Sequence, residues 1–375
     1  MRAFCAAVLL AVGFSVVDGA QAPAPPPKKN PLLKLIEPWP APDAMKKRRE
    51  DAEALSLFKS AEPFVFTLAA DFKALNKDHN PESKKRYAGE LRIPGEAGGA
   101  EVSLPVQLSA RGHLRRMSRT CDYVPLRVEF AKPGRAGTPF AKQNALKLVV
   151  QCIRGGEFEQ YLLKEYLAYR LFNVLTHQSF RARLAKVTYV DRETGRATGT
   201  RYAMFVEDDS DVAKRMEGRT VELPRLLFKD VHTDTLMPMM IFEYMIGNTD
   251  FSIFALHNVR LVQRPDKSIH PIPYDFDISG LVAPPYAVPD RAFLITSVRD
   301  RVYRGPCRRQ EQIDPYLANF VAKKDLLRAL PDSIPGLEKA SRDDVRSYID
   351  GFFSAIKTPK DARKLFVECS DKPTM

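Results

Sequence analysis

The sequence is poor in the features that mark membrane and zinc proteins. Beyond its first residues, no apolar run approaches the ~18 residues that a membrane-spanning helix needs. Its six histidines are scattered, and none of its five cysteines lies in a Cys-x-x-Cys spacing. These absences argue against an integral membrane domain and against a zinc site.

Nucleic-acid-binding motifs are also absent. The net charge of +12 favours an anionic partner, which could be a phosphate compound, a membrane surface, a cell-wall polymer or a nucleic acid. The aromatic side chains, however, do not interleave with the basic clusters as they do in many nucleic-acid-binding proteins. We therefore expect no nucleic-acid partner. The alternative is that the charge serves only solubility.

The first residues have the layout of an export signal. Arg2 is followed by an apolar run from Phe4 to Val17 and then by the small residues of "VDGAQA". This layout predicts a signal peptide over residues 1–21, with an uncleaved anchor as the alternative. Residues 22–60 are predicted to be a Pro- and Lys-rich linker. We expect an exported protein, periplasmic or secreted, without an integral membrane segment after cleavage.

The rest of the chain divides by its apolar patterns. Residues 61–208 are predicted to be β-rich, because short alternating runs such as "YAGELRI" are separated by turn sequences such as "KPGRAGT". The stretch "EFEQYLLKEYLAYRLFNVL" has helical spacing instead and predicts one long, mostly buried helix. Residues 209–375 are predicted to be mainly helical.

The cysteines predict one disulfide. Export removes one of the five with the signal peptide, and the remaining four allow three pairings. Cys121 precedes the strand "VPLRVEF", and Cys152 follows the strand "ALKLVVQ". A hairpin of these strands would place residue 123 opposite Cys152, so we predict a Cys121–Cys152 bond. Cys307 and Cys369 remain either as a second pair or as free thiols.

Two polar stretches, "GNTDFSIFALHN" and "HPIPYDFDISG", carry the clearest chemical pattern. An apolar helix ends at Gly247, Asp250 follows in a loop, and Asn258 and Asp275 stand at the two ends of a predicted hairpin. The hairpin should bring its two ends to one edge. Phosphoryl transfer needs such a set: one carboxylate for the acceptor proton, and oxygen ligands that hold Mg²⁺ against the phosphates. The alternative is ordinary turn and capping chemistry.

The order of motifs resembles the CotH kinase family, a branch of the protein-kinase-like fold. The resemblance implies an α+β, bilobal protein-kinase-like fold, with an antiparallel β-rich N-lobe that carries one central helix and a mainly helical C-lobe that carries the catalytic loop. The whole layout is also similar to exported bacterial proteins. The segments that carry the resemblance are "ARGHLRR", "VPLRVEF", "NALKLV", "YLLKEYLAYRLFNVLT", "VTYVDRETGRATGTRYAMFVED", "GNTDFSIFALHN" and "IPYDFDISG", across about residues 110–282.

The resemblance implies a role for individual residues. Asp250 matches the catalytic aspartate. Asn258 and Asp275 match the metal ligands, and Asp277 offers a second carboxylate ligand. Glu165, in the long helix, matches the glutamate that pairs with a phosphate-binding lysine.

The partner of Glu165 remains open at this point. Lys147 and Arg127 are the candidates, and Lys147 is favoured; the alternative is that Glu165 is a surface residue. Arg111 and the glycine after it are expected to fold over the nucleotide, although they do not form a glycine-rich loop. His257 is expected to be a structural hydrogen-bonding residue.

The sequence therefore favours an exported kinase-like phosphotransferase that uses ATP and Mg²⁺ to modify a protein or another hydroxyl acceptor. Transfer of AMP instead of phosphate is a variant of this hypothesis. The alternative is a non-catalytic envelope or secreted binding protein on a kinase-like scaffold.

Overall fold

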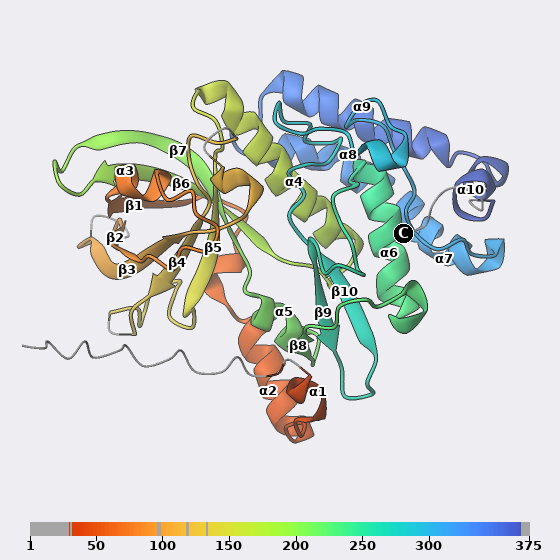
Figure 1. Cartoon of the computed structure of the whole chain (residues 1–375), viewed down its shortest axis with the longest axis horizontal. Helices are drawn as coiled ribbons and strands as arrows, with labels where there is room; N and C mark the ends of the chain where they lie inside the picture. The colour runs from red at the N-terminus through yellow and green to blue at the C-terminus, as the bar shows by residue number, and fades with distance from the viewer. Residues whose placement is uncertain (1–29, 31, 96–98, 118–119, 133, 369–375) are drawn as a thin grey trace, which may run out of the picture.

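The chain folds into a β-barrel and a mainly helical part that lie side by side (Figure 1). The predicted signal peptide lies outside the residues that the computed structural model describes. Those residues are 30, 32–95, 99–117, 120–132 and 134–368.

Seven strands close into the barrel in the order β1-β2-β3-β4-β5-β7-β6. Neighbouring strands are antiparallel except β1 and β6, whose parallel pairing closes the barrel. The strands are β1 (Phe64–Ala70), β2 (Tyr87–Ile93), β3 (Val102–Ala110), β4 (Leu126–Phe130), β5 (Ala145–Val150), β6 (Ala182–Asp191) and β7 (Ala197–Val206).

The barrel interior is filled by side chains. In β3, Leu104, Val106 and Leu108 are buried at every second position, because successive residues of a strand point to opposite faces. Phe66 stacks on Phe205 inside the same core, at 5.6 Å between ring centroids. The interior is therefore a packed core and not a channel.

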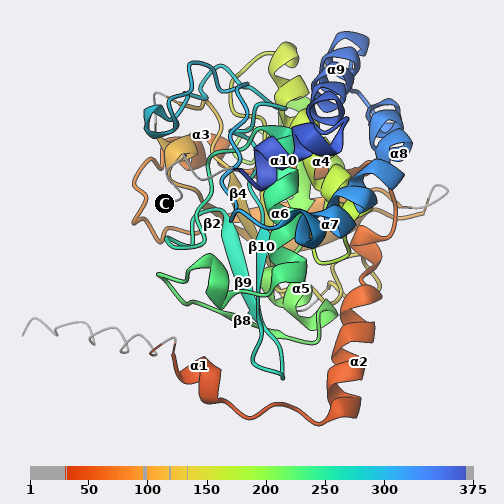
Figure 2. The ribbon, with the colours of Figure 1, turned by 90° about the vertical axis from the view of Figure 1, so that its right-hand side faces the viewer.

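Most of the helices gather on one side of the barrel, and α4 lies between them and the strands (Figures 1 and 2). A second sheet, in the order β10-β9-β8, accompanies them. These strands are β8 (Arg219–Val221), β9 (Val259–Gln263) and β10 (Ile269–Pro273). The helices of this part are α4 (Glu159–Leu175), α6 (Thr233–Ile246), α7 (Gln310–Ala322), α8 (Lys324–Ala329), α9 (Lys339–Ala355) and α10 (Pro359–Phe366). The remaining ones are α1 (Leu33–Ile36), α2 (Pro42–Glu53), α3 (Phe72–Asn76) and α5 (Asp209–Arg215).

Strand β7 serves two cores. Ala203 and Phe205 face the barrel interior, whereas Met204 and Val206 pack in the same cluster as α4, α6 and α9. Because side chains alternate along a strand, the outer face of the barrel becomes one wall of the helical core. Helix α4 therefore belongs to the helical core and lies outside the barrel.

The predicted bilobal protein-kinase-like arrangement, with a β-rich lobe around one central helix, is wrong. The strands close into a barrel, and the long helix packs outside it. The error lies in the parallel pairing of β1 with β6, which joins strands far apart in the chain. Alternating patterns predict strands but do not identify a distant partner. The α+β class itself agrees with the structure.

The Cys121–Cys152 disulfide is confirmed, with 4.7 Å between the two Cα atoms. The predicted register was wrong by one residue: Leu126 pairs with Leu148, so the strand count places Asp122 and not residue 123 opposite Cys152. The bond is compatible with an exported protein, because disulfides persist in oxidising compartments.

Cys307 is also disulfide-bonded. Cys369 lies outside the described residues. Within the predicted linker, Pro42–Glu53 form helix α2, which buries Met45 and Ala52. No helix in the described ranges is long and apolar enough to cross a membrane.

Candidate functional site

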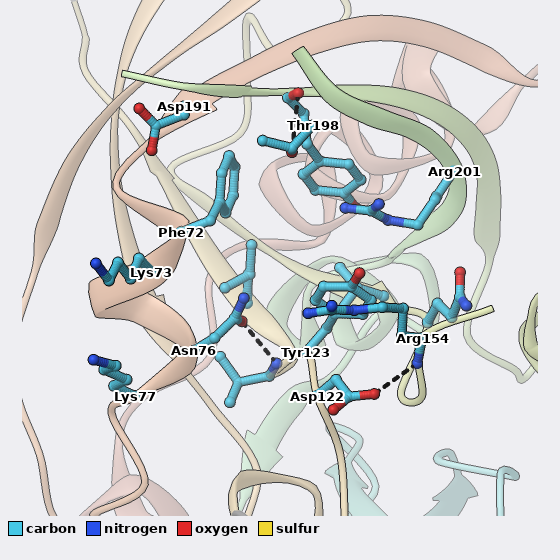
Figure 3. A pocket seen from close by; sticks show the side chains of 15 residues that line it. Phe72, Lys73, Asn76, Lys77, Asp122, Tyr123, Arg154, Asp191, Thr198 and Arg201 are labelled. Atoms are coloured by element: carbon cyan, nitrogen blue, oxygen red, sulfur yellow. Dashed lines mark hydrogen bonds between the residues drawn. The ribbon is translucent and has the colours of Figure 1, made fainter. Parts of the chain in front are cut away.

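Two cavities in the described structure bear on function. One, of about 680 Å³, opens at one end of the barrel (Figure 3) and contains none of the side chains predicted above. The other, of about 350 Å³, is a cleft between the barrel and the loops that follow α6 and the β9–β10 hairpin. Its lining includes the predicted residues Arg111, Asp250, Asn258, Asp275 and Asp277.

The loop that carries Asp250 begins where α6 ends. This helix is apolar on all sides and buried, and it stops at Gly247 because the backbone turns left-handed there, at φ 64°. Ser252 and His257 then exchange backbone hydrogen bonds of 2.9 Å, which closes the loop. The closed loop places His257 and Asn258 next to Asp250.

Several polar groups fix the Asp250 carboxylate. His257 Nε2 lies 2.8 Å from Oδ1, and Asn258 Nδ2 donates to Oδ2 at 3.0 Å. The backbone N–H of Asp250 donates to Asn248 Oδ1 at 2.9 Å. The hydrogen bond to Asp250 raises the pKa of His257. His257 thus has the structural role predicted for it, and the Asp250 carboxylate favours its protonated form.

The β9–β10 hairpin brings Asn258 and Asp275 to the same edge, as predicted. Val259 pairs with Pro273, and the N–H of Tyr274 donates to the carbonyl of Asn258 at 3.0 Å. Both Asn258 and Asp275 have left-handed backbones, at φ 52° and 66°. Such conformations are costly for residues with a side chain and concentrate at functional sites.

Asp277 is a buried carboxyl group behind this edge. The Tyr286 hydroxyl donates to its Oδ2 at 3.1 Å, and Arg115 Nη1 lies 3.9 Å from the same oxygen. Burial, followed by the negative charge of Asp275, raises the pKa of Asp277 to about 6. Burial and the neighbouring carboxylate of Asp275 therefore both favour the protonated form of Asp277.

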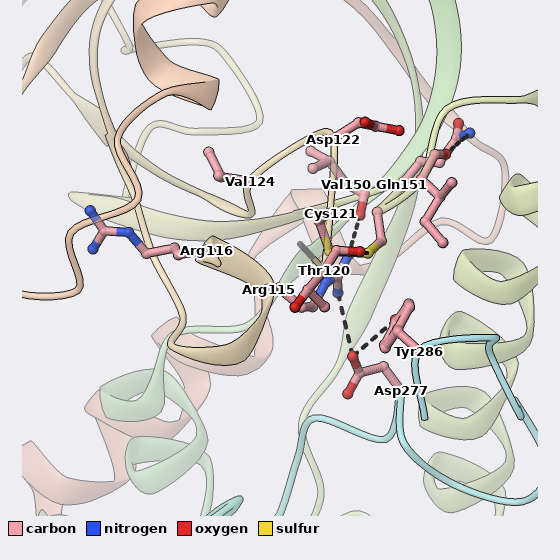
Figure 4. The surroundings of a disulfide bond; sticks show 12 residues. Arg115, Arg116, Thr120, Cys121, Asp122, Val124, Val150, Gln151, Asp277 and Tyr286 are labelled. Atoms are coloured by element: carbon pink, nitrogen blue, oxygen red, sulfur yellow. Dashed lines mark hydrogen bonds and ion pairs between the residues drawn. A yellow bond between two sulfur atoms is a disulfide. The ribbon is translucent and has the colours of Figure 1, made fainter. Parts of the chain in front are cut away.

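Arg115 is the main site residue that the sequence analysis missed. Its Nη1 lies 3.7 Å from Glu165 Oε2, and its Nη2 donates to the carbonyl of Val150 (Figure 4). One guanidinium therefore connects the barrel, helix α4 and Asp277. Arg115 lies in "ARGHLRR", one of the segments that carried the family resemblance, but nothing in that segment indicated its partners.

The predicted pairing of Glu165 with Lys147 or Arg127 is wrong. Glu165 is only 2% exposed, and its cation is Arg115, from the segment that follows β3. Burial, followed by the charge of Asp277, raises the pKa of Glu165 well above its usual range. Sequence patterns place Glu165 on a buried helix face but cannot identify the loop that reaches it.

Lys147 and Arg127 have other partners. Lys147 Nζ is 2.6 Å from Asp209 Oδ1 and lies 4.7 Å from the centre of the Tyr274 ring, which lines the cleft. Burial lowers the pKa of Lys147. The side chain of Arg127 is 45% exposed and pairs with Glu129 at 3.3 Å. Lys147 is thus adjacent to the cleft, and Arg127 lies outside it.

Arg304 supports the loop that carries Asp250. Its Nη1 donates to the carbonyls of Thr249 and Phe251, both at 2.6 Å. These two residues flank Asp250, so Arg304 fixes the loop from behind. No sequence signal distinguishes this arginine from its basic neighbours.

The donor groups suit a hard cation that is shared with a ligand. Among the described residues, no three His, Cys, Asp or Glu side chains lie close enough to hold a metal ion by themselves. Mg²⁺ needs fewer, because it takes one or two carboxylates and completes its shell with water and phosphate oxygens. Asp275 and Asn258 offer such a partial set, because no hydrogen bond in the described structure uses Asn258 Oδ1.

No family model matches this chain, and no curated protein matches it by sequence. The chemistry of the cleft is therefore interpreted from its own geometry.

Proposed function

We propose that the cleft binds a nucleoside triphosphate such as ATP together with Mg²⁺ and transfers its phosphoryl group to a hydroxyl acceptor. A protein is the acceptor class that we expect. The observation that carries the proposal is the meeting of Asp250, Asn258 and Asp275 in one cleft that also contains Arg111 and Arg115. Carboxylate and amide oxygens beside guanidinium groups are the combination that a metal-bound polyphosphate requires.

Each residue has a separate task in this proposal. Asp250, oriented by His257 and Asn258, accepts the proton of the acceptor hydroxyl. Asp275 and Asn258 would hold the metal ion through their side-chain oxygens. Mg²⁺, when bound, supplies positive charge that offsets the charge developing on the phosphoryl oxygens.

The arginines complete the charge balance. Arg111 lines the cleft, and Arg115 is held in place by Glu165, Asp277 and the Val150 carbonyl. A guanidinium held in this way can bind phosphate without first losing side-chain freedom. The motif order that resembles the CotH family implies the same roles for Asp250 and Asp275.

A non-catalytic binding protein is the second candidate. The observation in its favour is the position of Lys147, which is paired with Asp209 at 2.6 Å and does not line the cleft. A phosphotransferase would then rely on arginines alone for the phosphate. Transfer of AMP instead of phosphate would use the same residues.

Thermal unfolding with ATP and Mg²⁺, compared with Mg²⁺ alone, tests the proposal. A ligand at ~100 times its dissociation constant stabilises the fold by ~2.7 kcal/mol. We expect Asp275→Ala to abolish this stabilisation and Asp250→Ala to retain it while losing transfer. Transfer is followed with ATP labelled in the γ- or the α-phosphate, which separates phosphoryl from AMP transfer.

Asp343→Ala is the matched control, because Asp343 is half exposed on α9 and, among the described residues, its ion pairs are with Lys339 and Arg346. An equal stabilisation by ATP in wild type and Asp275→Ala would refute the metal-ligand role. Stabilisation without transfer in the wild type, with every acceptor tested, would favour the binding protein.

A further inference from the structure

The larger cavity lies at an open end of the barrel, away from the candidate active site. Figure 3 shows it between α3 on one side and strands β6 and β7 on the other. Its floor is apolar and is formed by Phe72, Val124, Leu126 and Val150. Its volume of about 680 Å³ is within the range of small-molecule sites, and barrel mouths are a common place for them.

An arginine between two tyrosines dominates the wall. The Arg201 guanidinium lies 4.6 Å from the ring centres of both Tyr123 and Tyr189. Stacking on aromatic faces leaves the in-plane N–H donors of a guanidinium available. In the described structure these donors have no hydrogen bond or ion pair. A partly buried cation without a carboxylate partner is unusual and favours an anionic ligand.

Arg154 is a second cation on the same wall. Figure 3 shows its side chain extending into the hollow in front of Tyr123. Within the described ranges, this side chain also has no hydrogen bond or ion pair. The two nearby acids have other partners: Asp122 accepts the backbone N–H of Arg154 at 2.8 Å, and Asp191 accepts that of Thr194 at 2.8 Å.

The disulfide fixes this wall. Cys121 immediately precedes Asp122 and Tyr123, and Cys152 stands two residues before Arg154. The backbone N–H groups of Asp122 and Tyr123 both donate to the carbonyl of Cys152, at 2.9 and 3.1 Å. A wall that is fixed before binding loses little conformational freedom when a ligand arrives.

We propose that this cavity is a binding site for a small molecule with a planar apolar body and one anionic group. The anion would accept hydrogen bonds from Arg201 and Arg154, and the planar body would lie against the rings and aliphatic side chains of the floor. The shared chemistry is that of an aromatic carboxylate, phosphate or sulfate. The proposal is independent of the phosphotransferase proposal, because none of its residues lines the other cleft.

A pair of fluorescent probes tests the site in the native protein with its disulfides intact. 8-Anilinonaphthalene-1-sulfonate carries an anionic group on a planar naphthalene ring system, and N-phenyl-1-naphthylamine has the same rings without the sulfonate. We expect Arg201→Gln and Arg154→Gln to weaken binding of the sulfonate by roughly tenfold each, as the loss of a hydrogen bond to a charged group would. Binding of the neutral probe should change little.

Arg127→Gln is the control, because Arg127 is an exposed strand arginine of the same barrel outside the cavity. Equal sulfonate binding by the wild type and the Arg154→Gln variant would overturn the proposal. An equal loss of both probes would also overturn it, because the arginines would then act through shape alone. Arg154 is exposed, so we expect the Arg154→Gln variant to fold. This variant therefore decides the test even if Arg201→Gln fails to fold.

Discussion

Glu243 is a buried carboxyl group directly behind the candidate catalytic loop. It is 2% exposed, and neither side-chain oxygen has a hydrogen-bond partner in the described structure. Its backbone carbonyl accepts the N–H of Asn248, the residue whose side chain holds Asp250. Burial raises the pKa of Glu243 to about 8, so the group keeps its proton at neutral pH.

This proton makes the stability of the fold depend on pH. The unfolded chain releases the proton near pH 4.5, and the folded chain keeps it up to about pH 8. A group whose pKa is raised in the folded state contributes its full stability at pH values below its pKa in the unfolded chain. That stability is lost as the pH rises from the unfolded-state pKa to the folded-state pKa. The side chain at this position in the Glu243→Gln variant is neutral at every pH, so the variant does not lose this stability. We expect its free energy of unfolding to rise relative to that of the wild type by about 1.4 kcal/mol per pH unit in this window.

Urea unfolding at several pH values between 5 and 8 measures the difference between the two proteins. Glu311→Gln is the control, because Glu311 is exposed near the start of α7. Parallel pH profiles for wild type and Glu243→Gln would mean that Glu243 is ionised in the folded protein.

At the same scale, the sequence predicted the local part of the candidate site and missed the distant part. Asp250, Asn258 and Asp275 are brought together by one loop and one hairpin, whose patterns are visible in neighbouring residues. Arg115 meets Glu165 only because two segments far apart in the chain pack together. Residue patterns carry no information on such a contact.

At the scale of elements, the disulfide joins the outer ends of β4 and β5. It closes a separation of 31 residues, for which the loss of loop entropy in the unfolded chain predicts about 3–4 kcal/mol of stabilisation. We expect the double variant Cys121→Ser with Cys152→Ser to lose about this much free energy of unfolding. Chemical denaturation measures it, and the double Ala variant controls for the cost of burying two hydroxyl groups.

A loss below ~1 kcal/mol in the double Ala variant would show that the hairpin holds its ends without the bond. In that case the N–H groups of Asp122 and Tyr123, bonded to the Cys152 carbonyl, would be sufficient.

Individual strands and helices were predictable because their periodicities differ. The runs "FVFTLAA" and "YAGELRI" became β1 and β2, and the helical spacing after residue 158 became α4. The closure of the barrel was not predictable. The alternating pattern of β1 shows which of its faces is buried, but it does not specify which strand pairs with it, and the partner is the distant strand β6. Helices in polar segments, such as α2, gave too weak an apolar pattern to be recognised.

At the scale of the whole molecule, the barrel and the helices share one wall. Val149, Met204 and Val206, on the outer faces of barrel strands, pack in one cluster with α4, α6 and α9. The barrel has its own interior core as well. Because the outer strand faces would be left exposed without the helices, the barrel should not remain folded alone. We expect the two parts to unfold in one transition.

Two leucine truncations test this coupling. Leu163 on α4 lies in the shared core, Leu108 on β3 lies in the barrel interior, and both are fully buried. Each Ala variant should lose ~2–5 kcal/mol. Hydrogen exchange under native conditions should show that Leu163→Ala lowers protection in β2 and β3 as well as in α6, and that Leu108→Ala does the same, because opening of either core then requires opening of both. If Leu163→Ala left β2 and β3 fully protected, the barrel would be stable by itself, and the shared wall formed by Met204 and Val206 would be only a contact between two independent folding units.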